Sequence, residues 1–351
     1  MATKILDILK KGTVIPALPL ALNEDKTLDE YSQKRLVHYY IDAGAGGIAA
    51  GVHTTQFEIR RPEFNLYEKV LRVTYNEIKK RNRLSDFIKV AGVCGETKQA
   101  ISEANLAKEI GYDVALLSFV GLNHLSEEEL LNHVQLIAAI MPIFGFYLQP
   151  AAGGRVLSYE FWRKFVEIPQ VVAIKTAPFN RYQTLDVIRA IAYSSRYNDI
   201  TVYTGNDDNI VPDLLTKYRF EVNGESREIQ FAGGLLGHWS VDTHLAVKLF
   251  RHIKDKTLSI DELLSMGCAV TDCNRAYFDV ANGFKGCIAG INDVLARQGL
   301  LKGNWCLLDK EVLSVGQATE ITRVRNQYRW LCDDSFILEN LEKWNQLAEK
   351  Q

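Results

Sequence analysis

The chain has 351 residues, of which 47% are hydrophobic, so it can form one large domain or two smaller ones with a sizeable core. Its formal net charge is -2 and it has no basic run, which argues against nucleic acid or an anionic membrane as a partner. Six scattered cysteines without a Cys-x-x-Cys pair predict reduced thiols. Residues 1–12 lack the apolar core of a signal peptide and no apolar run could span a bilayer, so we expect a cytoplasmic location.

From Thr13 onward, apolar runs alternate with amphipathic stretches. The apolar runs predict strands at 14–20, 46–52, 87–94, 113–119, 143–148, 171–176, 200–204 and 231–237. Helical patterns follow the first seven, at 28–43, 62–81, 97–110, 126–140, 158–166, 181–195 and 209–217. This alternation, without a Gly-x-Gly-x-x-Gly motif after the first strand, favours a (β/α)8 TIM barrel over an open doubly wound sheet.

The remaining sequence is predominantly helical. Helices are predicted at 243–254, 260–281, 285–298 and 312–341. We therefore predict a barrel with a catalytic pocket over residues 1–241 and a C-terminal helical extension, packed on the barrel, over residues 242–351. A charged segment at 219–230, with Asn223-Gly224 at its centre, predicts a short surface hairpin or loop.

Lys175 is the residue that the predicted strands do not explain. It follows four apolar residues, 171–174, in a strand that the pattern predicts to be buried on both faces. A buried lysine is unfavourable unless it is paired or unless burial lowers its pKa, and a neutral amine forms a Schiff base with a carbonyl. The alternative is a lysine whose head group reaches water at the strand end.

In a barrel, the carboxyl ends of all strands face one pocket, so the polar residues there become candidates. They are Thr54 and Thr55 after the second strand, Tyr147 in the fifth, Lys175 in the sixth, Asn206 and Asp207 after the seventh, and Gly234 and His238 in or after the eighth. The hydroxyls and backbone N–H groups of Thr54 and Thr55 can hold the carboxylate of a keto acid. Two isolated histidines do not indicate a metal site, and we expect none.

Three of these stretches resemble the Schiff-base lyases and synthases typified by dihydrodipicolinate synthase and N-acetylneuraminate lyase. The stretch His53-Thr54-Thr55-Gln56 is similar to the family's Gly-Thr-Thr-Gly-Glu motif, and Tyr147-Leu148-Gln149-Pro150 is similar to its Tyr-x-x-Pro motif. Ile174-Lys175 is similar to the strand end that carries its lysine, 28 residues after Tyr147. The resemblance extends from about Thr13 to Leu301.

The resemblance implies an imine between Lys175 and pyruvate or a related 2-keto acid, with Tyr147 moving protons, no cofactor, and a homo-oligomer, either dimer or tetramer. The stretch 205–208 is similar to one with which the sialic acid lyases contact a hydroxyl-rich substrate, which implies substrate contacts at Asn206 and Asp207; a helix cap is the alternative. Two features depart from the pattern. Residues 120–123 lack the second tyrosine of the synthases, and Gln56 and Phe57 replace a glycine and a glutamate.

We therefore predict a metal-free class I lyase or aldolase that cleaves or forms a carbon–carbon bond through a lysine Schiff base. Dihydrodipicolinate synthase and a sugar-acid dehydratase are alternatives within the same family. A non-catalytic keto-acid-binding relative and a metal-dependent barrel aldolase are alternatives from other classes. The expected partner is a small-molecule 2-keto acid.

Overall fold

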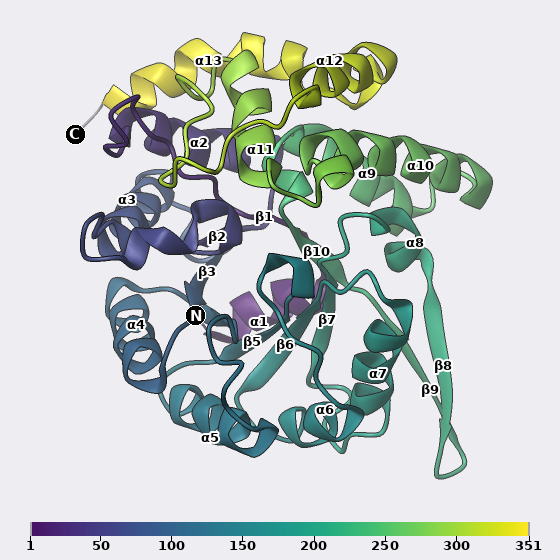
Figure 1. Ribbon diagram of the computed structural model, residues 1–351. Helices are drawn as coiled ribbons and strands as arrows, with labels where there is room; N and C mark the ends of the chain where they lie inside the picture. The colour runs from purple at the N-terminus through teal and green to yellow at the C-terminus, as the bar shows by residue number, and fades with distance from the viewer. Residues whose placement is uncertain (1, 350–351) are drawn as a thin grey trace.

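The structure is a computed structural model that describes residues 2–349. Eight parallel strands form one sheet in the order β1-β10-β7-β6-β5-β4-β3-β2. A parallel bridge between Ala17 and Ala49 joins β1 to β2, so the sheet closes on itself and the predicted (β/α)8 TIM barrel is confirmed (Figure 1). The strands are β1 (Val14–Pro16), β2 (Gly47–Ala50), β3 (Ile88–Val93), β4 (Val114–Leu117), β5 (Ile143–Tyr147), β6 (Val171–Thr176), β7 (Thr201–Thr204) and β10 (Gly233–Leu236).

A helix follows each barrel strand and lies on the outside of the sheet (Figure 1). These helices are α2 (Glu30–Ala43), α3 (Tyr67–Lys80), α4 (Thr97–Ile110), α5 (Glu127–Ala138), α6 (Tyr159–Phe165), α7 (Arg181–Ala192), α8 (Ile210–Leu215) and α9 (Thr243–Asp255). The prediction that α3 begins at Pro62 is wrong. Asn65 has a φ of 48°, a left-handed conformation that a continuous helix does not contain.

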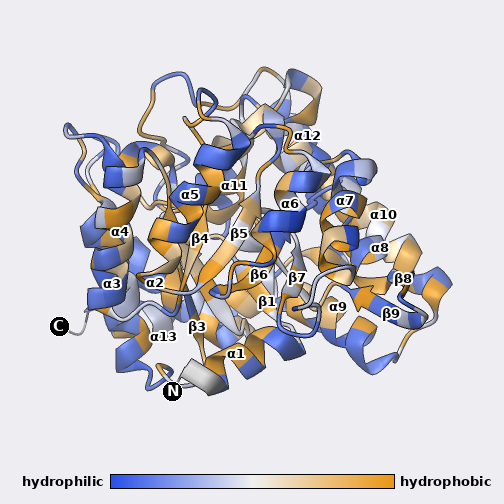
Figure 2. Cartoon of the chain, turned by 90° about the horizontal axis from the view of Figure 1, so that it is seen from below, coloured by the Kyte–Doolittle hydropathy of each residue, from blue (hydrophilic) through white to orange (hydrophobic). Residues whose placement is uncertain are grey.

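The strands separate two apolar layers, because successive side chains of a strand point to opposite faces. Side chains such as Ile15, Val90 and Leu116 form one cluster that fills the barrel. Their neighbours along the strands belong to a larger cluster between the sheet and the helices. Figure 2 accordingly shows hydrophobic strands at the centre of the molecule and hydrophilic residues on the outer helices.

One further helix, α1 (Ala2–Lys11), was not predicted from the sequence. Its Ile5 and Leu9 side chains belong to the cluster inside the barrel. The hydroxyl of Tyr203 donates a hydrogen bond to the carbonyl of Leu9 (2.9 Å), and Gly12 lies against Ala232, just before β10 begins. The helix therefore covers the amino-terminal end of the barrel and leaves the carboxyl ends of the strands as the open end.

The C-terminal helices lie along one side of the barrel, beside α2 and α9 (Figure 1). They are α10 (Ile260–Tyr277), α11 (Cys287–Arg297), α12 (Gln317–Gln327) and α13 (Asp334–Glu349). The single helix predicted at 312–341 is two helices, because the chain turns between them to bury Asp333. That carboxylate accepts hydrogen bonds from the Tyr39 hydroxyl and from the backbone N–H groups of His244 and Leu245. Since α9 packs on α2 as the eighth barrel helix, we place the start of the extension after Asp255 rather than at residue 242.

The predicted surface hairpin is confirmed. β8 (Lys217–Val222) and β9 (Glu225–Gln230) pair antiparallel, and Asn223 and Gly224 both have positive φ, as a tight hairpin turn requires. The hairpin extends from the side of the barrel (Figure 1). Within residues 2–349, no helix combines the length and the hydropathy that crossing a bilayer would require.

Candidate active site

Lys175 points into the barrel at the carboxyl end of β6. Its neighbours in the ladders are Phe146 on β5 and Tyr203 on β7, both of which face the barrel interior. The side chain is only 7% exposed, and its Nζ lies 4.2 Å from the centroid of the Phe146 ring. Gly205 makes room for the lysine, because a Cβ at that position would lie 2.4 Å from Lys175 Cε. The amine is therefore held inside the protein, as the sequence predicted, and not at a solvated strand end.

A cavity of about 110 Å³ opens beside this amine. We call it the barrel cavity. Its polar lining consists of His53, Thr54, Gln149, Lys175 and Asp207, with backbone at Gly205 and Gly237. Its apolar lining comes from the strand ends and from the C-terminal extension, namely Ala17, Val52, Phe146, Leu148, Ala151, Ala152, Ala177, Phe179, Phe278, Phe284 and Cys287. A concave, mostly apolar site with a few convergent polar groups is the usual form of a small-molecule site.

Burial changes the protonation of every ionisable group in the barrel cavity. Burial lowers the pKa of Lys175 to about 8, and the negative charge of Asp207 offsets part of this shift. Burial raises the pKa of Asp207 to about 7, against the opposing effect of Lys175. His53 has its pKa lowered to about 4 by burial and by the lysine charge, so its ring is neutral at pH 7. Because Lys175 and Asp207 interact, their apparent pKa values belong to the pair.

Asp207 is held in place by the backbone at the end of β10. Its Oδ1 accepts a hydrogen bond from the N–H of His238 (2.8 Å). Within residues 2–349, the other carboxylate oxygen, Oδ2, has no hydrogen-bond donor, and the side chain lines the barrel cavity. The carboxyl group can therefore accept a proton from a bound molecule, or donate one to it, without losing its own support.

Of the two threonines predicted to hold a carboxylate, only Thr54 lines the barrel cavity. The hydroxyl of Thr55 donates to the carbonyl of Leu18 (2.7 Å) and accepts from the N–H groups of Gly51 (3.0 Å) and Val52 (3.2 Å). Thr55 is fully buried, so it holds the loop after β2 and does not face the cavity. The prediction of substrate contact at Thr55 is wrong for this reason.

The loop after β2 also tolerates the replacement of the family's glycine. Gln56 has a φ of 67°, a conformation that glycine adopts easily and other residues rarely do. Its Oε1 accepts a hydrogen bond from the N–H of Leu307 (2.7 Å) in the C-terminal extension. The contact with the extension thus supports a backbone conformation that the residue type disfavours.

Tyr147 does not lie in the barrel cavity. Its ring packs on Trp162 of α6 (centroids 4.9 Å apart), and its hydroxyl accepts a hydrogen bond from the N–H of Leu157 (3.2 Å). The spacing argument failed because of an irregularity in the ladder between β5 and β6. Ile143 pairs with Val171, 28 residues later, but Phe144 pairs with Ala173, 29 residues later. Beyond this bulge Phe146 is the neighbour of Lys175, so Tyr147 faces the helices.

The structure does not bring Asn206, Gly234 or the His238 ring to the barrel cavity. Asn206 is fully buried, and its Nδ2 donates to Asp213 Oδ2 (2.9 Å). A Cβ at Gly234 would lie 2.6 Å from the Trp239 ring, so this glycine serves packing. The ring of His238 stacks on Tyr277, with centroids 5.7 Å apart. The predicted substrate contacts of these three side chains are therefore corrected.

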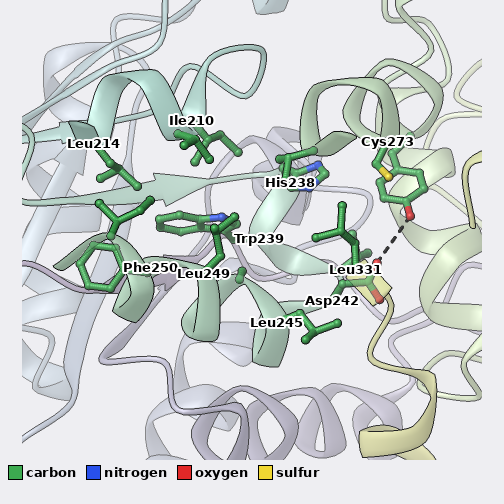
Figure 3. A pocket seen from close by; sticks show the side chains of 16 residues that line it. Ile210, Leu214, His238, Trp239, Asp242, Leu245, Leu249, Phe250, Cys273 and Leu331 are labelled. Carbon is green, nitrogen blue, oxygen red and sulfur yellow. Dashed lines mark hydrogen bonds between the residues drawn. The ribbon is translucent and has the colours of Figure 1, made fainter. Parts of the chain in front are cut away.

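The His238 ring instead lines a second cavity, between β10, α8, α9 and α10 (Figure 3). Leucine, isoleucine and aromatic side chains form most of its wall, among them Ile210, Leu249 and Phe250. Its volume is about 30 Å³, room for roughly one or two water molecules. It is too small for a keto acid with a substituent, so the barrel cavity is the candidate active site.

Sequence reasoning missed the residues that the extension and the strand ends add to this cavity. Phe278 and Phe284 come from the region between α10 and α11, and Cys287 is the first residue of α11. Burial raises the pKa of the Cys287 thiol well above its usual range, so the thiol stays protonated at neutral pH. No periodicity in the sequence indicated that these residues meet β6. Within residues 2–349, no three His, Cys, Asp or Glu side chains converge as metal ligands would.

Comparison with known proteins gives the chain its relatives. The chain is 27% identical over 209 residues to the 4-hydroxy-tetrahydrodipicolinate synthase of Methanosphaera stadtmanae, an alignment that covers 58% of this chain and 66% of that protein. It is 30% identical over 185 residues to the synthase of the same name from Halorhodospira halophila, covering 52% and 57%. The alignments with these two curated relatives therefore cover at most about two thirds of each relative's length.

Solved structures share the fold over nearly the whole chain. N-acetylneuraminate lyase from Fusobacterium nucleatum superposes with a TM-score of 0.71 at 16% identity, covering 91% of this chain and 99% of that one. YagE of Escherichia coli K12, solved in complex with pyruvate, superposes with a TM-score of 0.74 at 16% identity, covering 91% and 98%. At this identity the likeness shows the fold and assigns no activity.

The family itself is shown by sequence. The sequence model of the Dihydrodipicolinate synthetase family matches residues 10–217, more than half of the chain, from α1 to the start of β8. This range contains Lys175, Asp207 and the loop after β2. The names of the relatives are those of lyases and synthases. The chain belongs to the Dihydrodipicolinate synthetase family.

Proposed function

We propose that the protein is a class I lyase or aldolase in which Lys175 forms a Schiff base with pyruvate or a related 2-keto acid. The observation that carries the proposal is the placement of this amine, which is buried and faces a cavity at the carboxyl end of a barrel strand. Active sites of TIM barrels are built at that end. The amine makes no hydrogen bond or ion pair with any side chain of residues 2–349, which leaves it available to a carbonyl.

The lowered pKa supplies the reactivity. With a pKa of about 8, roughly a tenth of the amine is neutral at pH 7, about 300-fold more than for a lysine with the ordinary value of 10.5. Only the neutral amine attacks a carbonyl carbon. The resulting imine carries a positive charge when protonated and draws electrons from the neighbouring carbon–carbon bond, which is the step that such a lyase needs.

Thr54 is the side chain that we assign to the carboxylate of the keto acid. Its hydroxyl lines the barrel cavity and makes no hydrogen bond to residues 2–349. Gly237 lies beside it, because a Cβ at Gly237 would be 3.5 Å from the Thr54 hydroxyl. A hydroxyl and nearby backbone can orient a carboxylate without an arginine. Arg155 donates instead to the carbonyls of Leu122 and Leu125.

Asp207 is the residue that we assign to proton transfer. With Tyr147 outside the cavity, the carboxyl group of Asp207 is the ionisable side chain that faces Lys175 there. A pKa of about 7 suits a general acid and base at neutral pH, because both protonation states are populated. His53 is neutral in the same cavity and can orient a hydroxyl or a water molecule.

The lining of the cavity speaks against the two family alternatives. The aldehyde used by a dihydrodipicolinate synthase carries a second charged end, and a sugar acid carries many hydroxyl groups. Among residues 2–349, the charged groups of the cavity lining are Lys175 and Asp207, both assigned above to the reaction. The remaining wall is mostly apolar. These features support cleavage or formation of a bond to a less polar partner.

The test is reductive trapping with pyruvate. The full chain is incubated with pyruvate and sodium borohydride, digested, and the Lys175 peptide is analysed by mass spectrometry. We expect a reduced pyruvyl adduct on Lys175 and none in Lys175→Met. Lys89 is a matched control, because it is also a buried lysine on a barrel strand, but it pairs with Asp113 and donates to backbone carbonyls. No adduct with pyruvate or with longer 2-keto acids would overturn the proposal.

A further inference from the structure

Aromatic side chains lie at the mouth of the barrel cavity. Phe179 follows β6, and Phe284 lies between α10 and α11; their ring centroids are 5.6 Å apart. Both side chains are only partly buried, although both line the cavity. Phenylalanines that remain partly exposed beside a reactive lysine form a surface that a ligand can cover.

The third phenylalanine at this cavity comes from the end of α10. Phe278 is buried, and its ring approaches the backbone at Gly237, where a Cβ would lie 3.0 Å from Phe278 Cζ. Gly237 in turn lies beside Thr54. The aromatic wall therefore lies close to the position that we assign to the keto-acid carboxylate, and it begins where the polar part of the cavity ends.

The backbone at Phe284 is held in an unfavourable conformation. Its φ is 68°, a region that residues with a Cβ rarely occupy. The N–H of Phe284 donates to the carbonyl of Asp279 (3.0 Å), and the Asp279 carboxylate accepts from the N–H of Gly286 (3.0 Å) and from Asn282 Nδ2 (2.6 Å). Strained residues that their surroundings hold in place cluster at functional sites. The strain here places a phenyl ring against the cavity.

We propose that Phe179, Phe278 and Phe284 bind an apolar substituent of the substrate, an aryl or branched alkyl group on the aldehyde carbon. The substrate class is then a 4-hydroxy-2-keto acid with an apolar group at C4. This inference rests on the proposed Schiff-base function and names its second substrate. The phenyl rings offer flat apolar area, and a flat aryl group is well suited to packing on them.

The reaction balances without an oxidant or a reductant. Lys175 condenses with the C2 carbonyl and releases water, which gives the imine. Asp207 removes the proton of the C4 hydroxyl, the C3–C4 bond breaks, and its electron pair moves into the imine to give an enamine while the apolar aldehyde leaves. Protonation at C3 and hydrolysis of the imine release pyruvate and restore the amine. The reverse sequence joins pyruvate to the aldehyde.

The test compares aldehydes of two chemical classes as partners of pyruvate. The full chain is incubated with pyruvate and either benzaldehyde or isobutyraldehyde, or with glyceraldehyde or N-acetylmannosamine, and products are quantified by chromatography. We expect kcat/KM for the apolar aldehydes to exceed that for the polar ones by at least about tenfold. Preference for the polar aldehydes would overturn the inference, as would condensation with neither class.

Variants locate the subsite. Phe284→Ala and Phe179→Ala should raise KM for the apolar aldehyde about tenfold or more, with a smaller change in kcat and with pyruvate trapping retained. Phe220→Ala is the matched control, because Phe220 lies on β8 and contacts Tyr193, away from the cavity. If an alanine variant does not fold, Phe284→Leu and Phe179→Leu replace it. An unchanged KM contradicts the subsite.

The two proposals fail in different ways. Absence of a pyruvate adduct on Lys175 overturns the Schiff-base function and with it the subsite. An adduct on Lys175 together with a preference for polar aldehydes overturns the subsite alone.

Discussion

Phe146, and not Tyr147, is the neighbour of Lys175 in the ladder between β5 and β6, and its ring centroid lies 4.2 Å from Nζ. An aromatic face attracts a cation and has no proton to give, so Phe146 supports the charged lysine without taking part in proton transfer. The acid and base of the reaction must therefore be sought elsewhere in the barrel cavity. The predictions below test this arrangement.

Replacing Tyr147 by phenylalanine should leave the chemistry intact. The change removes the hydroxyl that accepts the Leu157 N–H, so we expect a loss of about 0.5–1.5 kcal/mol in the free energy of unfolding. A general acid or base would instead be worth about 10²–10⁴ in rate. Turnover and urea denaturation of Tyr147→Phe measure the two effects. A hundredfold loss of turnover with retained stability would restore Tyr147 to the mechanism.

Replacing Asp207 by asparagine should separate imine formation from turnover. The carboxylate raises the pKa of Lys175, so its removal lowers that pKa below about 8, and the pH midpoint for trapping with pyruvate moves downward. Turnover should fall by about 10²–10⁴ because the proton acceptor is lost. Asp208→Asn is the control, since Asp208 does not line the cavity. A trapping midpoint that stays in place or rises would contradict the coupling of Lys175 and Asp207.

Replacing Gly205 by alanine should displace the lysine. The new Cβ would lie 2.4 Å from Lys175 Cε and 2.9 Å from Cγ, so the side chain must move away from its present position. A misplacement of about 1 Å can reduce a rate 10²-fold, and we expect trapping to slow by at least about tenfold. Mass spectrometry at timed intervals gives the rate, and thermal denaturation checks the fold. Trapping at the unchanged rate would show that the lysine has room to spare.

Gln56 tests the link between the loop after β2 and the extension. Gln56→Ala loses the hydrogen bond to Leu307 and keeps the positive φ, so we expect it to destabilise the protein by about 1–3 kcal/mol. Gln56→Gly loses the same hydrogen bond but adopts this φ without strain, so it should be the more stable variant by about 1 kcal/mol. Urea denaturation of both variants measures the order. The reverse order would mean that the backbone at residue 56 is not strained.

The sequence determined the fold and the nucleophile, because both follow from local patterns. Apolar runs of strand length alternate with helical periodicity, and only a barrel or a doubly wound sheet accommodates such alternation. A single lysine at the end of a buried strand is visible in the same pattern, and the structure places Lys175 inside the barrel.

Only the tertiary structure decided which side chains surround that lysine. A bulge at the start of the β5–β6 ladder exchanges the faces of Phe146 and Tyr147, and such a shift depends on how two strands pack in the closed barrel rather than on the spacing between them. Phe278 and Phe284 reach the cavity because the extension folds back on the barrel, more than 100 residues after Lys175. Side-chain direction and long-range contact are set by the packing of distant elements, and local periodicity carries no information about them.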